Sequence, residues 1–521
     1  MKQFFTVITL LFSLHDVSFA QNEARPNILF IMTDDQSFPH ASAYGYQGVE
    51  TPAFDRIAKQ GLLFTNAYTQ APGCSPSRAS ILTGLHIWQL EEAGSHAAGF
   101  PTKFKGFQEL LKTDNYHTGY TGKGWSPGDY EALGRTQNPA GKEYNQQKIV
   151  SPDGMSFIDY YKNFRDFLDE DSVEGPFSFW MGGQEPHRVY RYGVGIARGM
   201  DTARIEVPAF LPNDPVVKVD MADYLLEIEW FDQQVGRVLD MLEDRNLLEN
   251  TIIVYTSDNG MPFPRAKGNI YDYGVHVPLA IMWPAKIKEA RLVTDPVGLI
   301  DLMPWFVQSA GLDFKALEKQ LGYTISGESI LDKISGNKPT ITYSGRERHS
   351  SARWNNLPYS SRSIRKGDYL LIYNYFPERW PSGAPKQLNT NGKECCEGYD
   401  DIDNSPSLAL LMDGDMKDMT AGTIDLEKTG RSSPNKYTQY VNLFGDLRPQ
   451  VELFNVNNDP ACLINLALQT KYKKQTQSLK SELLNYLKTT NDPRMSGNDS
   501  FDKYPRRVGS IKEYPKPKWA K

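Results

Sequence analysis

Two pairs of oxygen-bearing side chains stand directly after short apolar runs. The pair Asp34-Asp35 follows Ile28–Met32, and the pair Asp258-Asn259 follows Ile252–Tyr255. Such runs are typical of buried strands, and open α/β sheets bind ligands beyond the carboxyl ends of their strands. Adjacent carboxylates there are costly unless a cation or hydrogen-bond donors compensate them, and oxygen ligands of this kind suit Ca²⁺. Each pair taken alone also fits a helix cap or a turn.

A second feature is the segment Cys74-Ser75-Pro76-Ser77-Arg78. A lone match to this pattern fits a buried, inert cysteine equally well. The segment resembles the signature of the type I sulfatases, whose cysteine is oxidised after translation to formylglycine (3-oxoalanine) by a formylglycine-generating maturase. Within that family the chain is most similar to sulfamidase-like (heparan N-sulfatase-like) bacterial sulfatases, over nearly all of its length after the first 20 residues.

The resemblance implies covalent catalysis at position 74. The hydrated aldehyde would attack the sulfur of a sulfate ester or sulfamate through one hydroxyl, and the second hydroxyl would then expel sulfate. A thiol or a serine would stay trapped as a sulfated adduct. The resemblance also implies a Ca²⁺ site made of the oxygen of residue 74 and four side chains: Asp34, Asp35, Asp258 and Asn259.

Four further residues receive catalytic roles by the same resemblance. Lys123 and Lys267 would contact sulfate and form a cationic clamp with Arg78, and preorganised charge is usually the largest catalytic contribution. His187 would bind sulfate and protonate the leaving group. The chain departs from the family at Trp125, where most sulfatases carry a histidine that helps to hold the hydrated aldehyde or assists its collapse, so that role is unassigned.

A polar and aromatic cluster follows the region of these motifs. It contains Arg346, His349, Arg353 and Trp354. Because sugar-binding sites often combine such groups, we predict that the cluster binds the substrate. A surface loop with ion pairs is an equally good interpretation.

The elements that must position these side chains alternate along the chain. Up to about Gly367, apolar runs alternate with amphipathic segments such as Tyr224–Leu242, which favours a mainly parallel α/β sheet. We expect a catalytic domain over residues 21–367 and a C-terminal subdomain over residues 368–521. The resemblance implies the alkaline-phosphatase-like sulfatase fold, in which helices flank a large, mostly parallel sheet and a smaller C-terminal α+β domain carries an antiparallel sheet.

Composition and the first 20 residues limit the possible partners and the location of the protein. The chain has 521 residues and a net charge of −6, so no basic footprint points to nucleic acid. Residues 1–20 read as a secretory signal peptide, with Lys2 before the apolar stretch Phe4–Leu14 and small residues before Ala20. The apolar stretch is too short for a mature membrane anchor, and no later segment reads as a membrane span. We therefore expect an exported protein, periplasmic or secreted.

Conversion of Cys74 would leave three cysteines. Cys395 and Cys396 are neighbours, and we expect that they do not pair with each other in a relaxed geometry. One of them could pair with Cys462 after export, and three unpaired thiols are the equal alternative.

These features predict a secreted sulfatase that removes sulfate esters from a sulfated carbohydrate. Export favours algal polysaccharide fragments such as ulvan or carrageenan. The alternative is an N-sulfoglucosamine sulfohydrolase that acts on glycosaminoglycan fragments. A phosphatase on the same fold would need a second metal with histidine ligands, which the scarcity of histidine argues against. A polysaccharide-binding protein whose Cys74 is never converted is the non-enzymatic alternative, and the chemical state of residue 74 distinguishes it.

Overall fold

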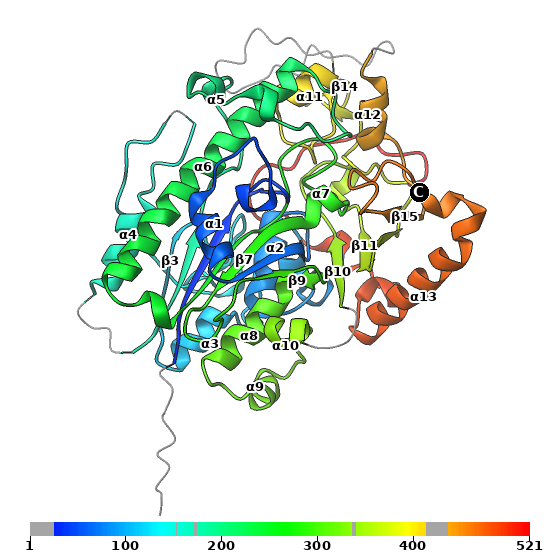
Figure 1. Cartoon of the computed structure of the whole chain (residues 1–521). Helices are drawn as coiled ribbons and strands as arrows, with labels where there is room; N and C mark the ends of the chain where they lie inside the picture. The colour runs from blue at the N-terminus through cyan, green and yellow to red at the C-terminus, as the bar shows by residue number, and fades with distance from the viewer. Residues whose placement is uncertain (1–24, 153, 171–174, 336–339, 413–435, 521) are drawn as a thin grey trace, which may run out of the picture.

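A nine-stranded sheet forms the centre of the molecule (Figure 1). Its strands are β1 (Asn27–Thr33), β2 (Leu62–Tyr68), β3 (His117–Gly122), β4 (Lys142–Glu143), β5 (Phe177–Gly182), β6 (Thr251–Ser257), β7 (His276–Met282), β8 (Arg291–Val293) and β9 (Val297–Gly298). They lie in the order β4-β3-β5-β1-β6-β7-β2-β8, with β9 beside β2. β7 runs antiparallel to both of its neighbours, whereas the other pairs are parallel. The prediction of a large, mostly parallel sheet is confirmed.

The structure is a computed structural model that describes residues 25–152, 154–170, 175–335, 340–412 and 436–520. The predicted signal peptide lies outside these residues. Among the helices of the described ranges, none is both long and apolar enough to cross a membrane.

Helices cover both faces of the sheet. They include α1 (Pro52–Lys59), α2 (Cys74–Thr83), α3 (Phe107–Thr113), α4 (Tyr160–Leu168), α6 (Pro215–Asp244), which contains the predicted helix, and α8 (Leu302–Ser309). Side chains of β1 alternate between the two faces, as a strand requires. Leu29 and Ile31 join the core under α1, α4 and α6, while Ile28 and Phe30 join the core under α2, α3 and α8. Figure 1 shows these two groups of helices on opposite sides of the sheet.

A second, antiparallel sheet packs beside the first. It consists of β10 (Ile341–Arg346), β11 (Ser361–Lys366), β12 (Tyr369–Asn374) and β15 (Val451–Asn455), in that order. The apolar side of α13 (Lys473–Thr489) covers it, since Leu479, Leu483 and Leu487 share a buried cluster with Ile364 and Leu371. The expected antiparallel sheet is thus present. Because β10 and β11 precede residue 367, the division of the chain at that residue stays a prediction.

The remaining elements are short and surround these layers. They are α5 (Val194–Ala197), α7 (Asp272–Val275), α9 (Phe314–Leu321), α10 (Ile330–Ser335), α11 (Pro406–Leu411), α12 (Thr438–Gly445), α14 (Ser500–Lys503) and a hairpin of β13 (Lys386–Leu388) and β14 (Glu394–Glu397).

The cysteines differ from expectation. Cys395 and Cys396 on β14 form a disulfide with each other, so both alternatives, a bridge to Cys462 and three unpaired thiols, are wrong. Chain connectivity holds their Cα atoms 3.8 Å apart. Burial separates them from the other candidate partner, because Cys462 is a free thiol buried in an apolar cluster with Phe454, whereas Cys395 is exposed.

A buried ion-pair network joins the antiparallel sheet to the end of α13. Arg362 of β11 is fully buried, and its guanidinium lies 2.7 Å from Glu347 Oε1 and 2.7 Å from Asp492 Oδ2. At the end of the same strand, Lys366 makes a partly exposed pair with Glu482 at 2.8 Å. The two pairs offer a matched comparison between a buried and an exposed contact on one strand.

We predict that Arg362→Met lowers the free energy of unfolding by about 3–5 kcal/mol, because it leaves Asp492 buried without its cation. The control Lys366→Met removes an exposed pair and should cost about 1 kcal/mol or less. Urea unfolding of both variants measures the difference. Equal losses in the two variants would contradict the assignment of this network as a stabilising link.

Candidate active site

Polar segments that follow four parallel strands meet at one edge of the large sheet. β1, β6 and β3 lead into Asp34-Asp35, Asp258-Asn259 and Lys123, and β5 leads into the loop that carries His187. Asp35 has φ +77°, in the left-handed region. Residues other than glycine rarely adopt this conformation, and such strain concentrates at functional sites. The structure therefore brings together the side chains that the sequence placed at separate strand ends.

Cys74 is the first residue of α2 and is fully buried among these groups. Its Sγ lies 3.2 Å from Asp34 Oδ1 and 3.8 Å from Asp35 Oδ1. Ligand atoms of Cys74, both aspartates and Asp258 all lie within 4.8 Å of one another. Burial, followed by the charge of Asp34, raises the pKa of the Cys74 thiol well above its usual value. An unmodified thiol at this position would therefore stay protonated and be a poor nucleophile.

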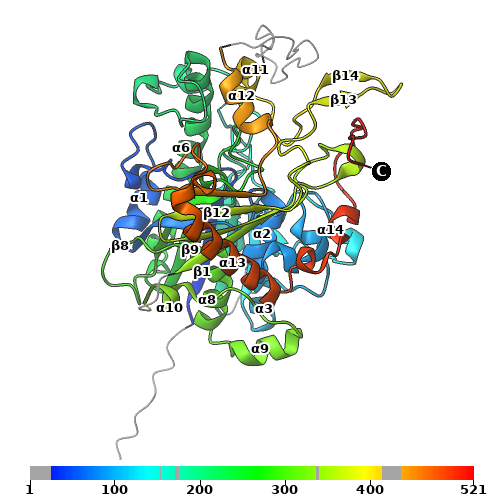
Figure 2. The same cartoon turned by 90° about the vertical axis from the view of Figure 1, so that its right-hand side faces the viewer.

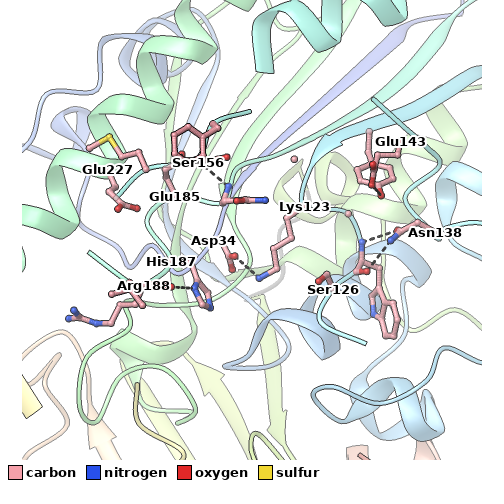
Figure 3. A pocket seen from close by; sticks show the side chains of 18 of the residues that line it. Asp34, Lys123, Ser126, Asn138, Glu143, Ser156, Glu185, His187, Arg188 and Glu227 are labelled. Carbon is pink, nitrogen blue, oxygen red and sulfur yellow. Dashed lines mark hydrogen bonds and ion pairs between the residues drawn. The ribbon is translucent and has the colours of Figure 1, made fainter. Parts of the chain in front are cut away.

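Two buried cations, Arg78 and Lys267, and the partly exposed Lys123 compensate the three carboxylates. The Nε of Arg78 donates to Asp258 Oδ2 at 2.7 Å. The other two carboxylates pair with lysines. Nζ of Lys123 lies 2.5 Å from Asp34 Oδ2, and Nζ of Lys267 lies 2.6 Å from Asp35 Oδ2. Figure 3 shows the first of these lysines reaching toward its aspartate.

The pKa of Asp34 shows that the nearby positive charges have a larger effect than burial. Burial acts to raise this pKa, but the charges of Lys123, His187 and Arg78 together outweigh burial and hold it well below its usual range. Asp34 is therefore ionised. Arg78, Lys123 and Lys267, the three cations predicted to bind sulfate, each pair with a carboxylate in this structure.

The donor set also fits a hard cation. Asn259 Nδ2 donates to Asp35 Oδ1 at 2.7 Å, but Asn259 Oδ1 is buried and has no hydrogen-bond partner within the described residues. A buried amide oxygen without a partner is costly. Together with the carboxylates of Asp34, Asp35 and Asp258, this oxygen forms an all-oxygen set of the kind that holds Ca²⁺.

His187 stands at the rim of the site with a side chain that is 37% exposed. Its Nδ1 lies 2.5 Å from the carbonyl oxygen of Arg188, which can only accept, so Nδ1 carries a proton. Its Nε2 lies 3.9 Å from Asp35 Oδ2. The other ring nitrogen, Nε2, faces the carboxylate cluster. It is the atom of His187 from which a leaving group could take a proton.

A cavity of about 680 Å³ opens beside this cluster. Asp34, Lys123 and His187 form part of its wall, and Glu143 and Glu227 line it further out (Figure 3). The reactive groups thus lie at the edge of a polar space that is large enough for a leaving group of several heavy atoms.

Trp125 has a positioning role. It is buried, packs edge-on against Phe100, and its indole Nε1 donates to the carbonyl oxygen of Ser75 at 2.9 Å. Ser75 follows Cys74 in the first turn of α2. The residue at the family-histidine position therefore holds the backbone next to residue 74 instead of presenting an imidazole to it.

The four residues of the predicted substrate-binding cluster lie in different parts of the structure. Arg346 and Arg353 are buried and both pair with Asp401, so they meet each other but do not line the large cavity. His349 packs against the backbone before Cys74, since a Cβ at Gly73 would lie 2.9 Å from its Nδ1. Trp354 lines a second cavity, which it shares with Arg353. The role of these four residues in substrate binding stays a prediction.

The sequence reasoning missed Asp403. Its Oδ2 lies 3.0 Å from Nζ of Lys267. Burial acts to raise the pKa of Asp403, but the charges of Lys267, His187 and His349 together outweigh burial and lower it. No strand or motif predicted from the sequence precedes this residue, and the three aspartates at positions 400, 401 and 403 were the one available signal.

Comparisons with known proteins agree with this geometry. The Sulfatase family profile matches residues 26–312. The chain is 27% identical over 509 residues to N-sulphoglucosamine sulphohydrolase of Homo sapiens, covering 91% of this chain and 93% of the relative. It is 26% identical over 514 residues to an ulvan-active sulfatase of Formosa agariphila, covering 90% and 76%.

One solved structure extends the comparison to the fold. It holds its substrate D-glucosamine-2-N,6-O-disulfate and matches with a TM-score of 0.59 at 20% identity, covering 92% of this chain and 100% of that one. The expected alkaline-phosphatase-like sulfatase fold is thereby confirmed. Since the family profile spans more than half of the sequence, the chain belongs to the sulfatase family and is a sulfuric ester hydrolase.

Proposed function

We propose that this sulfatase removes sulfate from a sulfated carbohydrate by means of a formylglycine at position 74 and one Ca²⁺. The observation that supports the proposal best is the fully buried Cys74 at the start of α2, with three carboxylates and their three cationic partners around it. The proposal extends to maturation of Cys74 by a formylglycine-generating enzyme and to export from the cell.

The residues divide the work as follows. Asp34, Asp35, Asp258 and Asn259 would hold the metal, which when bound would supply positive charge to the sulfate oxygens and to the oxygen of residue 74. The hydrated aldehyde of residue 74 supplies the attacking hydroxyl. Arg78, Lys123 and Lys267 stabilise the charge that develops on the transferring sulfate group.

His187 completes the reaction on the leaving-group side. When the bond between sulfur and the leaving oxygen or nitrogen breaks, the leaving atom takes the bond's electron pair and needs a proton. His187 stands between the carboxylate cluster and the large cavity, and it is placed to give that proton from Nε2.

The large cavity is the proposed place of the sugar. We propose fragments of algal polysaccharide such as ulvan or carrageenan as substrates, in line with the ulvan-active relative. N-sulfoglucosamine units of glycosaminoglycans are the second candidate, because the likeness to the human N-sulphoglucosamine sulphohydrolase extends over 93% of that relative. The two candidates differ in the leaving atom, which is oxygen for the first and nitrogen for the second.

Sulfate release by the matured enzyme tests the proposal. We expect release from either lyase-cut algal oligosaccharides or N-sulfated heparin disaccharides, and mass spectrometry should find formylglycine in the peptide that contains residue 74. Cys74→Ala and Lys267→Ala should each abolish turnover while leaving the fold intact. Near-normal activity of either variant would refute the mechanism, and an intact thiol in a host with the maturase would support a binding protein instead.

Removal of calcium tests the metal site. With Ca²⁺ at about 100 times its Kd, binding should stabilise the protein by about 2.7 kcal/mol, and a chelator should reverse the resulting rise in Tm. Asn259→Ala should weaken this response because it removes the oxygen without a partner, whereas Asn259→Asp should keep it. Asn163→Ala is a matched control, since both polar ends of that buried amide already have partners. An unchanged calcium response in Asn259→Ala would exclude that residue as a ligand.

Leaving-group dependence tests His187. His187→Gln should slow hydrolysis of an unactivated carbohydrate sulfate by roughly 10²–10⁴-fold, the usual contribution of general acid catalysis. An aryl sulfate with an acidic phenol needs little proton transfer, so its turnover should fall much less. Parallel kcat measurements on both substrates give the comparison, and equal losses would indicate that His187 binds sulfate without acting as the acid.

A further inference from the structure

A second cavity, of about 220 Å³, lies under the C-terminal tail. None of the residues that line it also lines the cavity beside Lys123. Three indoles form its apolar walls, from Trp354, Trp380 and Trp519, and we call it the tryptophan groove. Figure 2 shows the hairpin of β13 and β14 and the C-terminal end, two of the segments that contribute to it, on one side of the molecule.

The charge of the tryptophan groove is positive. Lys386, Lys516 and Lys518 line it, against one carboxylate, Glu394. The Nζ of Lys516 lies 5.8 Å from the ring centroid of Trp354, so ammonium and indole share one surface. The whole chain carries a net charge of −6, so this basic surface is a local feature and does not follow from the overall composition.

The arginines of the groove walls are already paired. Arg353 pairs with Asp401, and Arg379 lies 2.7 Å from Asp502. The charge that remains for a ligand is therefore that of Lys516 and Lys518. Lysine ammonium groups are compact point charges on flexible stems, and they bind sulfate groups without requiring one fixed orientation.

Hydrogen bonds hold the tail in place, so the groove is preformed. The hydroxyl of Tyr514 donates to Ser351 O at 2.8 Å, and the amide of Leu388 donates to Glu513 O at 2.9 Å. The indole of Trp519 donates to the carbonyl oxygen of Glu378 at 3.1 Å, and its side chain stays 41% exposed. A preformed site avoids the ordering cost that a loose tail would add to binding.

We infer that the tryptophan groove binds a unit of a sulfated oligosaccharide outside the catalytic cavity. The inference rests on the proposed function for the class of ligand. Indole faces carry partial negative charge and pack against the C–H faces of sugar rings, while ammonium groups pair with sulfates. Both parts of the ligand therefore have a counterpart on one surface, and Trp354 takes up the carbohydrate-binding role that the sequence suggested for it.

The groove also communicates with the candidate active site through one loop. Asp401 binds Arg353 in the groove wall, and Asp403, two residues further on, lies 3.0 Å from Nζ of Lys267. One short loop thus contacts both an arginine of the groove wall and the lysine of the candidate active site.

Direct binding to the full-length Cys74→Ala protein is the test, because this protein should not consume its ligand. The probes are a heparin hexasaccharide and a carrageenan hexasaccharide, each beside its desulfated counterpart, so that the two sources of sulfate are compared. We expect at least one sulfated probe to bind and the desulfated probes to bind about tenfold or more weakly. Titration calorimetry at low and high salt would also show weaker binding as salt rises.

Groove variants locate the binding. Trp519→Ala and the double variant Lys516→Gln/Lys518→Gln should each weaken the sulfated probe by about tenfold, the effect of losing an aromatic or charged anchor. Trp519→Phe should retain most of the affinity, because phenylalanine keeps an aromatic face for the sugar but loses the hydrogen bond that holds the tail to Glu378. This variant therefore separates stacking on the ligand from anchoring of the tail. Lys315→Gln/Lys319→Gln, on the exposed side of α9, is the matched control for charge and should bind as the parent does.

Affinity that is unchanged in both groove variants would overturn the inference, as would equal binding of sulfated and desulfated probes. The outcome is separable from that of the proposed function. If the matured enzyme releases sulfate but the groove variants bind normally, the groove inference alone fails. If no sulfate ester is hydrolysed but the groove variants lose binding, the groove inference stands and the proposed function fails.

Discussion

Burial of three carboxylates within a few ångströms of one another is the constraint on which the rest of the structure depends. Asp34, Asp35 and Asp258 would repel each other strongly in a site without solvent, since two unit charges 4 Å apart interact by about 4 kcal/mol at an effective dielectric constant of 20. The fold pairs each of them with a cation, Arg78, Lys123 or Lys267, although burial and the charge of Asp34 still raise the pKa of Asp258 to about 7. Loss of one partner would leave a buried carboxylate without its cation and lower the free energy of unfolding, even where the fold persists.

This balance explains why so much of the chain is needed around one cysteine. The parallel strands supply the carboxylates at one edge, while α2 supplies Cys74 and Arg78 from a single turn. The C-terminal part contributes as well, because Asp403 contacts Lys267 from the loop that also anchors Arg346. The antiparallel sheet and its loops are therefore part of the electrostatic support of the site.

The sequence predicted those parts of the fold and site that local pattern determines. Apolar runs followed by Asp34 or Asp258 identified strand ends, and parallel strands bring their ends together whatever lies between them. Contacts between distant loops carry no such pattern, so Asp403 was missed. The indole of Trp125 shows the same limit, because a hydrogen bond to the Ser75 carbonyl depends on a packing arrangement that no spacing records. The burial of Cys462 is likewise a property of the folded chain that the spacing of the cysteines does not record.

The two halves of the site are built from different kinds of element, and this bears on specificity. The carboxylates expected to bind the metal follow strand ends and Cys74 begins α2, so the sheet and this helix fix their positions. The walls of the large cavity come mainly from loops, with Tyr120 of β3, Glu143 of β4 and Glu227 of α6 added. Loops change without disturbing the sheet, whereas a strand-end carboxylate cannot move without upsetting the charge balance. Chemistry at sulfur and choice of sugar can therefore vary independently on this fold.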